Sequence, residues 1–122
     1  MAKKILLVDD DPGAHMIIVP ILSKAGYLTI SAKNGEQALH LALNERPDMI
    51  ILDVIMPGIK GRDLCKKIKA YDVLKDIAVV FLTAKDSEDD IHAEIEAGAI
   101  THLTKPVNPT DLLHTIEGII GK

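Results

Sequence analysis

The sequence predicts an α/β protein with a parallel sheet, and three observations support this fold class. Short aliphatic runs alternate with longer segments that show helical periodicity and helix-capping residues. Most of the runs are continuously apolar, which is typical of strands covered by helices on both faces. The 122 residues suit one compact domain, so we expect residues 1–122 to share a single sheet.

Five segments are expected to form the strands of this sheet. The first and third are uniformly aliphatic, and the fourth is rich in β-branched residues. The second mixes polar and apolar residues, as an edge strand does, and the fifth is short. The expected strands are 5–8, 27–32, 49–52, 77–82 and 99–103.

Five helices are expected to alternate with the strands, and several have clear capping residues. Asp11 can cap the first, with Pro12 in the first helical position, where its missing N–H costs nothing. Asn34 and Gln37 have the spacing of a capping box. Pro20 is expected to kink or interrupt the first helix. The expected helices are about 12–25, 34–46, 61–70, 87–97 and 108–118.

Five successive strand–helix units predict the topology of the sheet. Right-handed crossovers place helices on both faces, which gives a flavodoxin-like three-layer sandwich with strand order 2-1-3-4-5. Ligands of such folds bind at the carboxyl ends of the strands, where the strand order reverses.

Composition narrows the function and the compartment. The net charge of −4 and the presence of only three aromatic rings argue against direct nucleic-acid binding. Cys65 is the single cysteine, which excludes an internal disulfide and favours the cytoplasm; we expect it to pack as a small apolar residue. No apolar run has the length of a signal peptide core or a membrane span, so no membrane partner is expected.

Polar residues stand at the ends of four of the expected strands. Asp9 and Asp10 follow the first, Asp53 ends the third, Thr83 follows the fourth, and Lys105 follows the fifth. Parallel strands end at the same edge, so three carboxylates converge and repel one another unless a cation is present. Hard oxygen ligands suit Mg²⁺, and an opposing lysine suits a phosphate group.

Over its whole length the chain resembles the response-regulator receiver family of two-component signalling. The resemblance is carried by the acidic pair Asp9–Asp10, by the turn Asp53-Val-Ile-Met-Pro-Gly with Gly61 beyond it, and by Thr83-Ala and Lys105-Pro at the ends of later strands. Each motif is weak alone, but their order along the chain is specific.

The resemblance implies a magnesium-dependent phosphoacceptor. Asp53 would be the nucleophile that forms an acyl phosphate. Asp10, Asp53 and the backbone carbonyl of Ile55 would ligate Mg²⁺, while Asp9 would act mainly through water. The protein would not be an enzyme in the ordinary sense, because it would catalyse only its own phosphorylation and dephosphorylation.

The resemblance also implies how the phosphoryl group is held. Lys105 would pair with it, the peptide bond from Lys105 to Pro106 would be cis, and Ala84 would leave room for it. Thr83 would donate its hydroxyl to a phosphoryl oxygen and form the switch with the residue at position 102.

Three positions depart from the usual pattern of the family. His102 stands where members commonly carry Tyr or Phe, and we expect its coupling to Thr83 to be weaker or pH-dependent. Ile55 and Lys85 cannot assist an attacking water, which predicts a long-lived phosphoryl group. The histidines have no metal-ligand spacing and are expected at the surface: His15, His40, His92, His102 and His114.

The expected partners are proteins. A sensor histidine kinase or a histidine phosphotransfer protein would donate the phosphoryl group. An unknown downstream protein would bind the face formed by the fourth helix, fifth strand and fifth helix. The chain itself is expected to be a monomer or weak dimer.

Three alternatives remain open at this stage. The chain can be a receiver module of a larger regulator or hybrid kinase, since an output domain would begin just after the fifth helix. A flavodoxin-like protein for FMN or a nucleotide would need a phosphate-binding loop where Asp9 and Asp10 would instead repel an anion. The third is an interaction domain that works without phosphate.

Overall fold

The computed structural model describes residues 2–54, 58–83 and 95–121 of the chain. The expectations for Ile55, Ala84 and Lys85, and for His92 in the fourth expected helix, lie outside the described residues. Of that helix the structure describes the end, where Ile95 and Glu96 are helical.

A five-stranded parallel sheet forms the centre of the molecule, with the order β2-β1-β3-β4-β5. This confirms the predicted topology, including the edge position of β2. The strands are β1 (Lys4–Val8), β2 (Leu28–Ala32), β3 (Met49–Asp53), β4 (Ala78–Thr83) and β5 (Thr101–Thr104).

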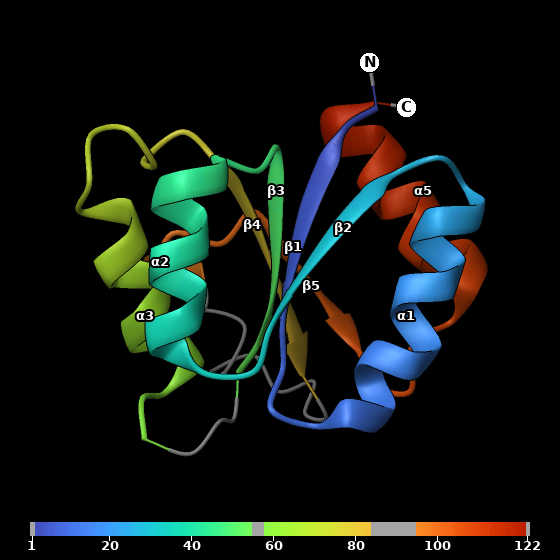
Figure 1. Ribbon diagram of the computed structural model, residues 1–122, viewed down its shortest axis with the longest axis horizontal. Coiled ribbons are helices and arrows are strands. Elements are labelled where there is room, and N and C mark those ends of the chain that lie inside the picture. Colours follow the sequence, from blue (N-terminus) through green and yellow to red (C-terminus); the bar gives the residue numbers. More distant parts are fainter. Residues whose placement is uncertain (1, 55–57, 84–94, 122) are drawn as a thin grey trace.

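Helices cover both faces of the sheet, as Figure 1 shows, with α2 and α3 on one side and α1 and α5 on the other. The predicted caps at Asp11 and Asn34 are confirmed, because each accepts a hydrogen bond from a backbone N–H of the first helical turn. Asn108 caps α5 in the same way. The helices described over their whole length are α1 (Pro12–Lys24), α2 (Gly35–Glu45), α3 (Gly61–Lys69) and α5 (Pro109–Ile120).

Pro20 was expected to kink or interrupt the first helix. The interruption does not occur, because α1 continues through Pro20 to Lys24. A proline at position 20 leaves the carbonyl of Met16 without its usual helical donor. Both residues face solvent, and 77% of Met16 is exposed, so water can satisfy that carbonyl. The exposed position of Pro20 therefore makes the missing hydrogen bond tolerable.

Two apolar cores lie on the two faces of the sheet, because alternate strand residues point in opposite directions. Leu6, Leu52 and Phe81 pack toward α2 and α3. Ile51 and Leu82 pack toward α1 and α5. Strands β3 and β4 are buried along their whole length, which explains their continuous apolar character.

Cys65 lies within the core beneath α3 and is fully buried. Burial raises the pKa of its thiol to about 11, and the nearby charge of Lys69 offsets only part of this effect. The thiol is therefore protonated at neutral pH, in agreement with the structural role that the sequence predicts.

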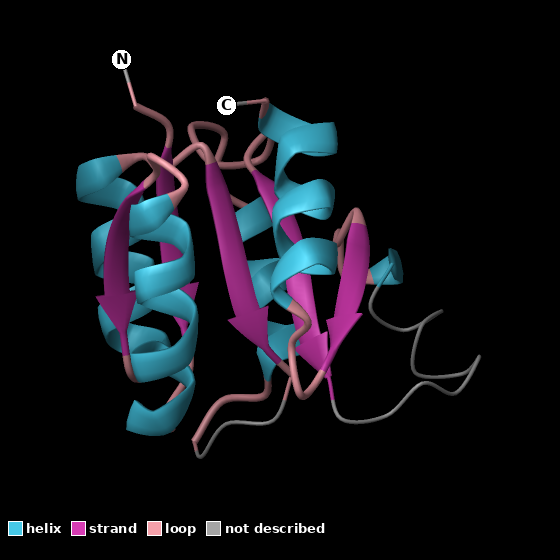
Figure 2. Cartoon of the chain, turned by 90° about the vertical axis from the view of Figure 1, so that its right-hand side faces the viewer, coloured by secondary structure: helices cyan, strands magenta, loops and turns pink. Residues whose placement is uncertain are grey.

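The carboxyl ends of all five strands lie at one edge of the sheet, and both chain termini lie at the opposite edge (Figure 2). Every functional residue that the sequence places after a strand is thereby brought to one side of the molecule. No helix among the described residues is both long enough and apolar enough to cross a membrane.

Candidate functional site

Three carboxylates meet where the adjacent strands β1 and β3 end. One side-chain oxygen from each of Asp9, Asp10 and Asp53 lies within 4.8 Å of the other two. Asp9 is completely buried and Asp53 is 7% exposed, whereas Asp10 is open to solvent. The predicted convergence of these three residues is confirmed.

Asp9 is held at every polar group by a neighbour. Its N–H donates to the carbonyl of Ala32 at 3.1 Å, which extends the pairing of β1 with β2 by one residue. Its carboxylate accepts a hydrogen bond from the N–H of Asp11 at 3.0 Å, where the chain turns into α1. The fixed backbone of this turn sets where the neighbouring Asp10 projects.

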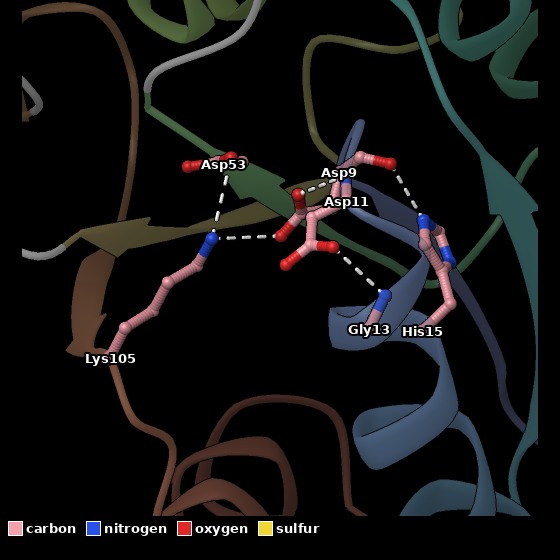
Figure 3. Close-up of polar contacts among 6 residues, drawn as sticks. All are labelled: Asp9, Asp11, Gly13, His15, Asp53 and Lys105. Atoms are coloured by element: carbon pink, nitrogen blue, oxygen red, sulfur yellow. Dashed lines mark hydrogen bonds and ion pairs between the residues drawn. The ribbon is translucent and has the colours of Figure 1, made fainter.

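Lys105 supplies the positive charge of the site. Its Nζ lies 2.9 Å from Asp9 Oδ2 and 3.4 Å from Asp53 Oδ2, so that it bridges two of the acids (Figure 3). Burial alone would lower the pKa of Lys105, but the hydrogen bond to Asp9 and the charges of Asp53 and Asp9 together raise it. The lysine is therefore charged at neutral pH.

The backbone around Lys105 is anchored to the neighbouring strand. Its N–H donates to the carbonyl of Thr83 at 2.8 Å, and the peptide bond from Lys105 to Pro106 is cis, as the resemblance implied. The hydrogen bond to Thr83 ties the backbone that carries Lys105 to the end of β4.

Thr83 and His102 occupy different levels of the sheet. Thr83 is the last residue of β4, is 5% exposed, and stands one position beyond Leu82, the register partner of Asp53. His102 is paired with Phe81, two positions before the end of β5, and is half-buried. The structure therefore brings Thr83 to the edge where the acids lie, and places His102 two residues behind it along the strands.

Gly61 holds the loop after Asp53 close to the strand. Its N–H donates to the carbonyl of Val54 at 2.9 Å. A Cβ at this position would collide with the carbonyl of Asp53 and would lie 2.8 Å from the Cα of Val54. Only glycine permits this approach, so Gly61 fixes the backbone on which Asp53 is presented.

His15 belongs to the site, although the sequence placed it at the surface. Its Nε2 lies 2.7 Å from the backbone carbonyl oxygen of Asp9, and its ring is partly buried. The surface expectation is therefore wrong for His15, whereas it holds for His40 and His114. The signal in the sequence was the position of His15 in the first turns of the helix that follows the acidic pair.

The donor set fits a magnesium ion. Three carboxylates against one ammonium leave an excess of negative charge in a small volume, and carboxylate oxygens are the ligands that Mg²⁺ prefers. Two of the acids are buried and the third is accessible, so a cation can reach the cluster from solvent while its inner side is fixed.

The chain matches the family model of the response regulator receiver domain over residues 5–117. It belongs to this family, whose members are signalling modules of two-component systems that accept a phosphoryl group on an aspartate. Histidine kinases or phosphotransfer proteins phosphorylate such domains, which bind Mg²⁺ at an acidic pocket. The fold and the residues at the strand ends agree with this membership.

The relatives include both short and long proteins. The chain is 37% identical to sporulation initiation phosphotransferase F of Bacillus subtilis, covering 96% of this chain and 93% of the relative. It is 34% identical to the phosphate regulon transcriptional regulatory protein PhoB of Pseudomonas aeruginosa, covering all of this chain and 53% of that protein. The chain thus spans about half the length of PhoB.

A solved structure with the same fold contains the metal. The receiver domain of the sensor histidine kinase PA1611 from Pseudomonas aeruginosa has a magnesium ion coordinated in its active-site cleft. It is 28% identical to this chain with a TM-score of 0.91, and the match covers 100% of both chains.

Proposed function

We propose that Asp53 accepts a phosphoryl group from the phosphohistidine of a sensor kinase or a phosphotransfer protein, in a reaction that requires Mg²⁺. The observation that carries this proposal is the position of the Asp53 carboxylate, between two further carboxylates and the ammonium group of Lys105. Burying a charged acid costs free energy, so a neutral residue would serve a purely structural role better at this position.

Asp10 and Asp53 are the side chains that would hold the metal, together with the carbonyl of Ile55 that the family resemblance implies. Asp10 is solvent-exposed and can ligate directly. Asp9 is occupied by Lys105 and by the N–H of Asp11, which suits contact with the ion through water. When bound, Mg²⁺ supplies charge neutralisation for the attacking carboxylate and the transferred phosphoryl oxygens.

Transfer would occur by in-line attack. A carboxylate oxygen of Asp53 forms the new bond to phosphorus while the bond from phosphorus to the donor imidazole nitrogen breaks, and the electron pair returns to that nitrogen. Lys105 already lies 3.4 Å from Asp53, so it can pair with the incoming phosphoryl oxygens. Positioning and charge, rather than proton transfer, would supply most of the rate.

The signal would leave through Thr83 and His102. The Thr83 hydroxyl would donate to a phosphoryl oxygen, and the population of conformers of β5 would shift as His102 reorients. Because His102 replaces the usual aromatic residue, we expect its coupling to Thr83 to be weaker or to depend on pH. Ile55 and Lys85 predict slow hydrolysis of the aspartyl phosphate.

The partners follow from this switch. A downstream protein would bind the face that includes β5 and α5. We expect no direct contact between this domain and nucleic acid. We also expect the domain to act in the cytoplasm as a monomer or weak dimer. The chain matches about half of PhoB, so a receiver module within a larger regulator is an equal alternative, with the same chemistry at Asp53.

Incubation with acetyl phosphate, with and without Mg²⁺, tests the proposal by intact mass. The expected result is one added phosphoryl group on the wild type in the presence of Mg²⁺ and none on the Asp53→Ala variant. Equal labelling of the variant would contradict the assignment, and equal labelling without Mg²⁺ would contradict the metal requirement.

A further inference from the structure

Among the described residues, His15 has one hydrogen-bond partner, the backbone of the acidic pair. Its Nε2 lies 2.7 Å from the carbonyl oxygen of Asp9 (Figure 3). A carbonyl can only accept, so Nε2 carries a proton and donates it to this bond. The other ring nitrogen, Nδ1, is buried and has no partner among the described residues, which suits a nitrogen that carries a lone pair and no hydrogen.

The contact acts on a peptide plane that also belongs to Asp10. The carbonyl of Asp9 and the N–H of Asp10 lie in one planar unit, which fixes the N–Cα bond of Asp10. With the following N–H of Asp11 held by the Asp9 carboxylate, this plane helps to set the direction of the Asp10 side chain. The other polar groups of Asp9 are held by Ala32, Asp11 and Lys105. The hydrogen bond from His15 therefore fixes the last polar group of Asp9, its carbonyl, which belongs to the peptide that leads to the exposed Asp10.

We infer that His15 is a positioning residue of the metal site, which orients Asp10 for Mg²⁺ through the peptide between Asp9 and Asp10. This inference rests on the proposed function, because it concerns the same cation. Preorganisation of an exposed ligand matters here, since Mg²⁺ tolerates little departure from octahedral geometry. The loss of this one hydrogen bond should weaken binding by about three- to tenfold.

Two substitutions of His15 separate its hydrogen bond from its packing. His15→Leu replaces the ring with an apolar side chain of similar size and removes the donor. His15→Gln keeps an N–H donor at a comparable distance from the backbone. His40→Leu is the matched control, because His40 is an exposed histidine on α2 whose side chain bonds to Asn44 rather than to the acidic pair.

The experiment is a titration with MgCl2 of the unphosphorylated protein, followed by ¹⁵N-amide shifts, with thermal unfolding of each metal-free variant in parallel. We expect a Kd raised about three- to tenfold for His15→Leu, near the wild-type value for His15→Gln, and unchanged for His40→Leu. The metal-free His15→Leu spectrum should differ from wild type chiefly at Asp10 and Asp11.

Each contrary outcome has a separate meaning. A wild-type Kd for folded His15→Leu would overturn the positioning role and leave the proposed function intact. A loss of affinity in His15→Gln equal to that in His15→Leu would also overturn it, because packing would then be the cause. No shift of the wild-type amides with Mg²⁺ would overturn the proposed metal site and this role together.

Discussion

The strands that carry the acids and the strand that carries His102 differ sharply in burial. Every residue of β3 is buried, and β3 is paired on both sides, with β1 and β4. In β5 three residues are half-buried and one is exposed, and the strand pairs only with β4 at the edge of the sheet. Asp53 therefore stands on a fully buried central strand, and His102 on a partly exposed edge strand.

This contrast suits a chemical switch. A nucleophile needs a fixed position, since small errors in geometry reduce phosphoryl transfer strongly. An element that reports the reaction must instead open or shift at a low cost in free energy, and such elements have few buried contacts. Under the proposed function, these two requirements would fall on β3 and β5, which are separated only by β4.

The largest expected effect compares apolar truncations in these two strands. Ile51 in β3 is fully buried and Leu103 in β5 is half-buried, and both pack on the α1–α5 face of the sheet. Ile51→Ala should lower the free energy of unfolding by about 2–5 kcal/mol, and Leu103→Ala by about 1 kcal/mol. Urea denaturation measures both. Equal losses would show that β5 is as tightly packed as β3.

A glycine pair tests the close approach next to Asp53. Gly61→Ala should destabilise by about 1–3 kcal/mol and reduce phosphorylation, because its Cβ would collide with the Asp53 carbonyl. Gly118→Ala is the control, since nothing lies within 4 Å of a Cβ there and alanine favours the helix by about 0.5–1 kcal/mol. Thermal unfolding should therefore shift in opposite directions; a neutral Gly61→Ala would contradict the proposed constraint.

The smallest expected effect concerns the pH dependence of the link between Lys105 and the acids. The pKa of Lys105 is raised in the folded protein, so its contribution is complete below the ordinary lysine pKa of about 10.4 and is lost as pH rises through the folded value. Lys105→Met should cost about 1–2 kcal/mol at pH 7, given that 30% of the side chain is exposed.

Denaturation from pH 7 to 11 measures this link. The difference in stability between the wild type and Lys105→Met should stay constant to about pH 10 and then shrink. A difference that already disappears between pH 7 and 9 would mean that another group governs it.

Much of the fold could be predicted because its signals are local. The aliphatic runs, the caps at Asp11 and Asn34, and the polar residues at strand ends are read over a few positions. Strand limits were less exact, as β5 covers residues 101–104 rather than 99–103. Ala99 is buried without lying in the strand, so its apolar character misled the prediction.

The errors came from residues whose roles depend on how helices dock. Pro20 is tolerated because α1 turns it to solvent, and His15 is part of the site because the same helix turns it toward β1. Sequence periodicity gives the faces of a helix but not the angle at which it packs. The convergence of Asp9, Asp53 and Lys105 was predictable because parallel topology alone brings the ends of their strands to one edge.

Chemical trapping tests the central claim most directly. Borohydride reduces an aspartyl phosphate to homoserine, so protein treated with acetyl phosphate and Mg²⁺, reduced, digested and sequenced by mass spectrometry reveals the modified residue. The account predicts homoserine at position 53 and unmodified aspartate at positions 9 and 10. Homoserine at either of those positions, or at none of the three, would contradict it.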